Sequence, residues 1–353
     1  MNAPSSTPVY LTAPDITQFG TALLIHGGAS AIDARIVMEH LVTSSAMGLH
    51  SHGVMRIPQY LAEMRSGVIN AVAMPTVSTV APARLAVDGQ RGFGQVVGMQ
   101  MVDALASPAR ANGIAMINGR HLGHTGRIGA YPEALANLGL IGIAVCNGAP
   151  SGHWVAPFGG SDGRVSTNPI AFAWPVDGSA PVVADFSTAT APEGVVRVMR
   201  DRGLEAPGGY LRDAAGHLTR DPNVLYAVPK GAIQPMGGDL GYRATALALL
   251  VEVLTTILND DAVNDSTRKG TDMTLIAIAP QSGFGGLARD LSSHIRASPP
   301  LDPARPVLMP GDRENTAAAA MKKIRLDGPI WTALIAAANA ANIALPTPVA
   351  GEI

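Results

Sequence analysis

Cysteine, charged residues and aromatic residues are all scarce in this sequence of 353 residues. Its one cysteine, Cys146, cannot form a disulfide within the chain, which is typical of a protein from a reducing compartment. Charged residues make up 15% of the sequence and the formal net charge is −2. Nucleic-acid binding requires clustered positive charge, so we expect no nucleic acid among the partners.

Long hydrophobic runs and a leader-like segment are missing as well. The longest apolar runs, such as LALLVEVLTTIL, look too short to span a bilayer. The first ten residues, MNAPSSTPVY, contain neither the charged nor the apolar region of a signal peptide. Hydrophobic residues still make up 47% of the chain, enough for a large core. We therefore expect a compact cytoplasmic protein that has no membrane partner.

Helical periodicity dominates both ends of the sequence. Residues 15–47 have apolar residues at helical spacing, with Ser30 and Asp33 as a possible capping box. A second helix is expected from Ile57 to Ser66, with Gly67 ending it. From about residue 287 onwards the pattern is helical again.

The middle of the chain follows a different pattern. Between about residues 76 and 286, short apolar runs alternate with segments of helical periodicity at 95–112, 127–138, 189–202 and 243–258. This alternation is typical of an α/β fold. We expect an α/β domain over residues 76–286 and a smaller helical domain built from residues 1–75 together with 287–353.

The segment LHSHGVMRIPQYL, residues 49–61, contains the first candidate site. If a helix begins just after His52, the side chains of His52 and Arg56 project to one side, beside Ser51. The helix dipole would keep the imidazole titratable near neutrality, and the guanidinium offers a planar fork for a carboxylate. This pair suits a 2-oxo or 2-hydroxy acid, with proton transfer at C2 by the histidine. In the alternative interpretation, Ser51 caps a helix and both charged groups face water.

A second candidate site is GRHLGHTGRIGAY, residues 119–131. It lies between an expected strand and an expected helix, where α/β proteins bind ligands, and it contains His121 and His124 among glycines. A glycine-rich turn with incidental histidines is the alternative. The spacings of His50 with His52 and of His121 with His124 would suit a metal, but no HExxH or carboxylate motif accompanies them, so we expect no metal site.

The usual dinucleotide fingerprint is missing. The segment GFGQVVG at 92–98 has the wrong spacing for G-x-G-x-x-G. Candidate anchors for an anionic cofactor are GRVSTNP, ADFSTATAPEG, MGGDLGYR and MPGDRE. Each places glycine beside hydroxyl or charged residues near an element end, where backbone N–H groups can bind phosphate. Taken singly, each of these segments is more often just a turn.

Taken together and in order, several segments resemble the malate/L-lactate dehydrogenase family. They are SHGVMRIPQY, GHTGRIGAY, VAPFGG, STNPIAFAWP, ADFSTA, the MGGDLGY region and MPGDRE. That family is distinct from the Rossmann-type enzymes and includes ureidoglycolate, sulfolactate and diketogulonate oxidoreductases and piperideine/pyrroline-2-carboxylate reductases. The resemblance implies NAD or NADP as cofactor, a non-Rossmann mixed-sheet α/β cofactor domain and a helical second domain. It also implies a homodimer whose active site lies between the domains, near the partner subunit.

The resemblance also suggests roles for individual residues. His52 looks like the family's acid/base, with Ser51 and Arg56 as neighbours, while His124 matches a histidine that has the proton-transfer role in some members. Thr167 and Asn168 match a segment that lines the same cleft. Besides His124, Thr167 and Asn168, the expected cofactor-binding residues are Asp185, Phe186, Ser187, Thr188, Ala189, Asp239, Leu240, Gly311, Asp312 and Arg313.

One departure from the family stands out. Many members have Gly-Gly-His-Lys-Gly where this chain has Asp239 and Leu240 between the glycines. Leu240 cannot offer a cation to the cofactor, and Arg243 is a candidate substitute. His153 and Trp154 occur where the family varies with substrate, so they either shape the substrate pocket or lie in a surface loop.

The reaction expected is reversible hydride transfer between NAD(P)H and C2 of a small 2-oxo acid or cyclic imino acid. The substrate, the choice between NAD and NADP, and whether His52 or His124 donates the proton stay open. Two alternatives also stay open. One is a metal-dependent lyase or hydrolase that uses His50, His52, His121 and His124, and the other is a catalytically silent ligand-binding relative.

Overall fold

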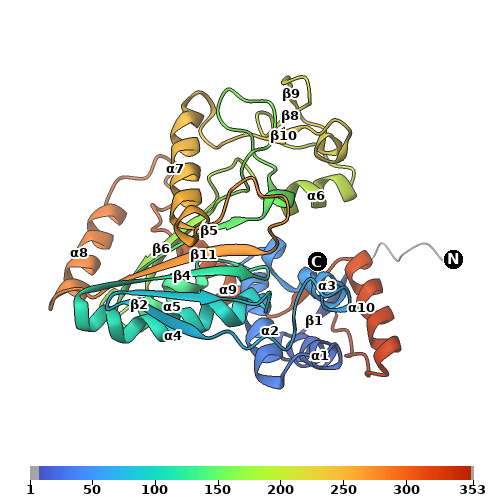
Figure 1. The fold of residues 1–353 in the computed structure, drawn as a ribbon, viewed down its shortest axis with the longest axis horizontal. Coiled ribbons are helices and arrows are strands. Elements are labelled where there is room, and N and C mark those ends of the chain that lie inside the picture. Colours follow the sequence, from blue (N-terminus) through green and yellow to red (C-terminus); the bar gives the residue numbers. More distant parts are fainter. Residues whose placement is uncertain (1–7, 351–353) are drawn as a thin grey trace.

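The computed structural model describes residues 8–350 and contains a seven-stranded mixed sheet flanked by helices (Figure 1). The strand order is β2-β3-β4-β11-β5-β6-β7. β3 and β4 run parallel, and the other neighbouring pairs run antiparallel. The strands are β2 (Val77–Ala81), β3 (Arg84–Asp88), β4 (Ile114–Leu122), β5 (Ile141–Gly148), β6 (Ile170–Trp174), β7 (Val182–Phe186) and β11 (Thr271–Ile278). The prediction of a mixed α/β fold is confirmed.

The central strand β11 explains why the sheet is buried. Its Met273, Leu275 and Ala277 are fully buried, and the strand pairs with β4 on one side and β5 on the other. Helices α4 (Gly94–Asn112) and α5 (Ala130–Asn137) cover the face that is lower in Figure 1, and α7 (Gly241–Leu254) lies above the sheet against β5. An apolar strand between two covered faces is expected in the middle of such a sheet.

The two ends of the chain meet in a helical part, defined here as β1 (Val9–Leu11), α1 (Ala13–His26), α2 (Ala31–Ala46), α3 (Ile57–Arg65), β12 (Ile324–Leu326) and α10 (Gly328–Ala341). β1 pairs antiparallel with β12, and the helices share one apolar core (Figure 1). Ser30 caps α2 by accepting a hydrogen bond from the N–H of Asp33, as the sequence predicts. Residues 1–7 and 351–353 of the expected helical domain lie outside the described residues.

Outside the helical part, the remaining elements form the sheet part. Above the sheet in Figure 1, α6 (Glu193–Asp201) packs with three short strands, β8 (Leu211–Arg212), β9 (Leu218–Thr219) and β10 (Ala232–Ile233). Two further helices, α8 (Phe284–Arg296) and α9 (Asp312–Ala320), precede the return of the chain to the helical part. The helix expected over residues 189–202 starts only at Glu193, because Pro192 precedes it with an extended backbone.

The apolar run expected to be too short for a membrane belongs to a longer helical stretch. Gly238–Asn259 has 22 residues and a mean hydropathy of 1.4 in its most apolar window, enough by length and composition alone to cross a bilayer. The prediction that this apolar run is too short to span a bilayer therefore does not hold, because the helical stretch continues beyond the run at both ends. Its Glu252 is buried and accepts hydrogen bonds from Asn147 and Asn168, which attach the helix to the sheet part.

The contact between α4 and α5 leaves no room for a larger side chain at Gly98. A Cβ atom at Gly98 would lie 2.3 Å from the ring of Tyr131, whose hydroxyl is fixed by a hydrogen bond to the carbonyl of Thr125. We expect Gly98→Ala to lower the free energy of unfolding in urea by about 1–3 kcal/mol through overpacking, despite the better helix propensity of alanine. The control is Gly208→Ala, where nothing lies within 4 Å of the new Cβ. Equal stability of the two variants would contradict this packing.

Candidate active site

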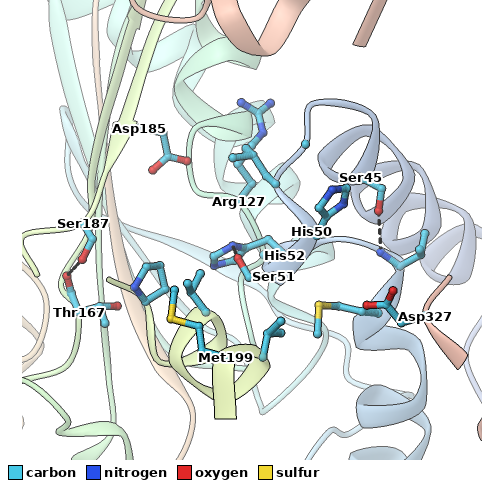
Figure 2. A pocket seen from close by; sticks show the side chains of 18 of the residues that line it. Ser45, His50, Ser51, His52, Arg127, Thr167, Asp185, Ser187, Met199 and Asp327 are labelled. Atoms are coloured by element: carbon cyan, nitrogen blue, oxygen red, sulfur yellow. Dashed lines mark hydrogen bonds between the residues drawn. The ribbon is translucent and has the colours of Figure 1, made fainter. Parts of the chain in front are cut away.

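A cleft of about 710 Å³ lies where the helical part meets the sheet part. Its walls come from residues within 45–55, 126–128, 185–187, 192–204 and 325–330, together with residues 167 and 169. Of the predicted site residues, Ser51, His52, Thr167, Asp185, Phe186 and Ser187 line the cleft, whereas Arg56 and His124 do not. Figure 2 shows Ser51 and His52 in the middle of the cleft, with Asp185 above them and Met199 below. Residues far apart in the sequence thus share one cavity.

His52 is at the end of a 3₁₀ turn, His50–His52, and not at the start of an α-helix. A second 3₁₀ turn, Val54–Arg56, separates it from α3, which begins at Ile57. The Ser51 hydroxyl lies 2.9 Å from Nδ1 of His52. Burial, together with the charges of Arg56 and Arg127, lowers the pKa of His52 to about 4. The expectation of a histidine that titrates near neutrality is therefore wrong for the free protein, because burial outweighs any dipole effect.

His124 stacks on His52, with ring centroids 5.7 Å apart and an interplanar angle of 15°. Its Nδ1 lies 2.7 Å from the Tyr60 hydroxyl, which in turn accepts a hydrogen bond from Nε2 of Gln95 on α4. Burial raises the pKa of Tyr60 well above its usual value, so the hydroxyl keeps its proton. When this hydroxyl donates to Nδ1 of His124, the proton of the neutral imidazole is on Nε2. Burial also lowers the pKa of His124 well below 6.5.

Arg56 is fixed beside the two histidines. Its Nε donates to the carbonyl of Ser51 at 2.6 Å and its Nη1 donates to Oε1 of Gln59 at 2.6 Å. Only 8% of the residue is exposed, and a Cβ at Gly194, in the first turn of α6, would lie 2.9 Å from Nη2. Within residues 8–350, no hydrogen bond engages Nη2. The structure therefore holds a cation rigidly, with Nη2 packed beside Gly194 and without a hydrogen bond among the described residues.

A further link between the two parts runs through His40 of α2, which the sequence analysis did not identify. Its Nε2 accepts a hydrogen bond of 2.8 Å from the backbone N–H of Arg127. The Arg127 side chain lines the cleft and pairs with Glu133. Arg127 was not predicted either, although it lies in the quoted segment GHTGRIGAY, three residues after His124. Lone polar residues such as His40 and Gln95 give no sequence signal of their own.

Asp185 accepts a hydrogen bond of 2.8 Å from the backbone N–H of Gly129. Its side chain projects into the cleft, and the surrounding walls separate it from bulk water. This enclosure raises the pKa of the carboxyl group, against the opposing effects of the Gly129 N–H and Arg127. Gly129 is close enough that a Cβ there would lie 2.9 Å from the carboxylate. A glycine is therefore needed where the loop meets the sheet.

Several predicted residues do not line the cleft. Asn168 is fully buried with a φ of 37°, and its amide donates to the carbonyl of Ala248 and to Glu252. Thr188 is also buried, and its hydroxyl donates to the carbonyl of Thr167. Ala189 is buried and forms a bridge with Pro235. These residues support the strand end that carries Thr167.

Other predicted cofactor residues lie at helix starts away from the cleft. Asp239 and Leu240 are exposed just before α7, and Arg243 extends over the ring of Tyr242. Gly311, Asp312 and Arg313 begin α9, where Asp312 pairs with Arg296. The next residue, Glu314, is close enough to Asp185 to raise its pKa.

The remaining candidates are separated in space. His153 and Trp154 do not line the cleft, and Trp154 packs against Tyr226 at 6.0 Å between ring centroids. His121 lies 3.0 Å from Asp88, and His50 is exposed at the cleft. Within residues 8–350, no three His, Cys, Asp or Glu side chains are arranged to hold a metal ion. The metal-dependent alternative is therefore not favoured.

The enclosed histidines should make stability depend on pH. Burial lowers the pKa of His40 to about 3 and that of His52 to about 4. The unfolded chain binds these protons near pH 6.5, so unfolding becomes easier as the pH falls from about 6.5 towards 4, at a cost of about 2 kcal/mol per histidine by pH 5. A glutamine at position 40 keeps an acceptor for the backbone N–H of Arg127, but it has no group that binds a proton in this pH range.

We therefore expect His40→Gln to reduce the stability lost between about pH 7 and pH 5 by about 2 kcal/mol, measured by urea unfolding at both values. Replacing the exposed His26 by glutamine is the matched control and should leave the loss as in the wild type. An unchanged pH dependence in His40→Gln would show that His40 is not held neutral.

Comparisons with known proteins agree with this geometry. The family model of malate/L-lactate dehydrogenase matches residues 11–335. The malate dehydrogenase of Pyrococcus abyssi is 33% identical over 255 residues, which cover 71% of this chain and 69% of that protein. The L-lactate dehydrogenase of Cupriavidus necator is 30% identical over 323 residues, covering 88% of this chain and 92% of that protein.

The fold is also similar to that of solved dehydrogenases. The crystal structure of a dehydrogenase from Sinorhizobium meliloti has a TM-score of 0.85 and 30% identity to this chain, covering 94% of this chain and 98% of that one. The relatives are named for oxidation or reduction of hydroxy or oxo acids. The ordered motifs, the mixed sheet and the cleft thus agree, and the chain belongs to the malate/L-lactate dehydrogenase family of oxidoreductases.

Proposed function

We propose that this protein catalyses reversible hydride transfer between NAD or NADP and C2 of a small 2-oxo or 2-hydroxy acid, or of a cyclic imino acid. The observation that carries the proposal is the stacked pair His52 and His124 beside the rigid cation of Arg56, with Ser51 and His52 lining the cleft. An imidazole pair suits proton transfer at C2, and a guanidinium with a free nitrogen suits the neighbouring carboxylate.

The sheet-side wall of the cleft fits a nicotinamide cofactor. It presents the hydroxyls of Thr167 and Ser187, the ring of Phe186 and the cation of Arg127 around Asp185. The volume of about 710 Å³ exceeds the need of a small acid alone. When bound, the cofactor supplies or accepts the hydride. Leu240 offers no cation in place of the lysine common in the family, so the choice between NAD and NADP depends on other residues.

The hydrogen bonds assign different roles to the two histidines. Burial favours the neutral form of His124. With the Tyr60 hydroxyl donating to Nδ1, the proton of the imidazole is on Nε2, from which it donates a hydrogen bond to the oxygen on C2 and stabilises charge there. His52 has the Ser51 hydroxyl at Nδ1, and a hydroxyl can either donate or accept, so His52 is free to change its protonation state. A substrate carboxylate at Arg56 offsets the positive charge that lowers the pKa of His52, and thereby prepares it for proton transfer.

The arrangement of the cofactor domain also belongs to the proposal. We expect the sheet part to act as a non-Rossmann cofactor domain and the helical part as the second domain. The largely antiparallel strand order supports this, because a Rossmann domain has a parallel sheet. The separate apolar cores of the two parts support the division as well.

A second copy of the chain is the expected partner. Helix α7 exposes Leu249, Leu250 and Val253, and the 3₁₀ turn that follows it exposes Ile257. Each is about half accessible, and such an apolar face is unusual on a monomer. We expect Leu250→Asp to shift the protein from dimer to monomer, measured by sedimentation equilibrium. The exposed Ile32 provides the control, Ile32→Asp, which should remain dimeric. A monomeric wild type, or a dimer unaffected by Leu250→Asp, would contradict the proposed interface.

His52 provides the test of the catalytic proposal. Removing a positioned acid typically lowers the rate about 10²–10⁴-fold. We expect His52→Ala to lower kcat by at least about 100-fold with folding intact, measured as NADH and NADPH oxidation against a panel of 2-oxo acids. His50→Ala is the matched control, because His50 is exposed at the same cleft. If His52→Ala turns over like the wild type, His52 has no part in the reaction.

The same assay tests the silent-relative alternative. A wild-type protein that oxidises neither NADH nor NADPH with any acid of the panel, yet is thermally stabilised by one of them, would be a ligand-binding relative without activity.

A further inference from the structure

We propose that the substrate is a monocarboxylic 2-oxo acid with a sizeable apolar side chain, such as a branched or aromatic one, and not a dicarboxylic acid such as oxaloacetate. This inference rests on the proposed function and defines its substrate class. It follows from the wall of the cleft that faces away from the cofactor residues.

That wall is apolar. Opposite Asp185, the cleft is lined by Leu49 and Met55 next to the catalytic turn, by Val195, Val198 and Met199 of α6, and by Ile330 of α10. Figure 2 shows Met199 below His52, on the other side of the cleft from Asp185 and Arg127. These side chains are only partly buried, because each has surface open to the cleft. A ligand that covers them removes apolar surface from water.

Arg56, which binds the substrate carboxylate in this proposal, directs the substrate side chain along this wall. Nη2 of Arg56 packs beside Gly194 in the first turn of α6, so the guanidinium lies next to the start of that helix. Val195, Val198 and Met199 follow within the next two turns of α6. An acid held by Arg56 therefore places its carbons beyond C2 against these side chains. Each methylene group buried there strengthens binding about fourfold.

Among the described residues, each arginine that lines the cleft has a carboxylate partner, and Arg197 near Arg56 lies 3.9 Å from Glu193. Of the arginines in residues 8–350 that line the cleft, Arg127 pairs with Glu133. Arg202 and Arg325 both pair with Asp327, and about half of each arginine side chain is exposed, so water screens their charges. A carboxylate pressed against Val198 and Met199 would lose its hydration without gaining a buried cation.

The wild-type enzyme provides the first test. We expect kcat/KM for 4-methyl-2-oxopentanoate or phenylpyruvate to exceed kcat/KM for pyruvate at least about tenfold, and to exceed that for oxaloacetate by more. A preference for oxaloacetate or pyruvate would overturn the inference while leaving the proposed function intact. Failure to oxidise NADH or NADPH with any of these acids or with a cyclic imino acid would overturn the proposed function itself.

A charge placed in the apolar wall provides the second test. We expect Met199→Arg to lower kcat/KM for 4-methyl-2-oxopentanoate at least about tenfold and to raise it for oxaloacetate, because the new cation pairs with the second carboxylate. Met74→Arg makes the same change at a surface residue outside the cleft and should keep the wild-type preference. If Met199→Arg does not fold, Met199→Gln should lower the rate for the apolar acid alone. An unchanged preference in the folded variant would show that this wall does not contact the substrate.

Discussion

The hydrogen bond between the Tyr60 hydroxyl and Nδ1 of His124 is the contact on which the candidate site depends. Tyr60 belongs to α3 of the helical part and His124 to a loop of the sheet part, so the bond joins the two parts at the cleft. Through the stacking of His124 on His52, it also sets the position of the histidine that lines the cleft. The same contact thus joins the two parts of the molecule and orients the imidazole pair.

Local features of the site are those that the sequence predicts well. Ser51, His52 and Arg56 are neighbours in the chain, so their proximity follows from any turn or helix, and the capping of α2 by Ser30 depends on adjacent residues alone. The mixed α/β fold follows from the alternation of short apolar runs with helical segments. The resemblance to the family motifs identified Thr167 and Asp185 as site residues, whereas the local patterns alone did not distinguish their segments from ordinary turns.

Features that depend on burial and on packing between distant segments are not evident from the sequence. The low pKa of His52 arises from enclosure by both parts of the molecule, which no short motif records. Asn168 lies beside Thr167 in the chain, but its backbone has a positive φ just before β6 and its side chain bonds to α7, away from the cleft. Gln95 and His40 are single polar residues in otherwise unremarkable helices, and their roles appear only when their partners come from elsewhere in the chain.

The pairing of β1 with β12 brings the C-terminal region of the chain to the cleft, where Leu326, Asp327 and Ile330 form part of the wall. During synthesis on the ribosome, the sheet part can assemble before these residues emerge from the exit tunnel. The cleft cannot be completed until they do. A polypeptide that is still being translated therefore lacks the finished pocket, and a chain that ended upstream of β12 would lose Leu326 and Ile330 from the cleft wall and Ile324 and Leu334 from the apolar core of the helical part.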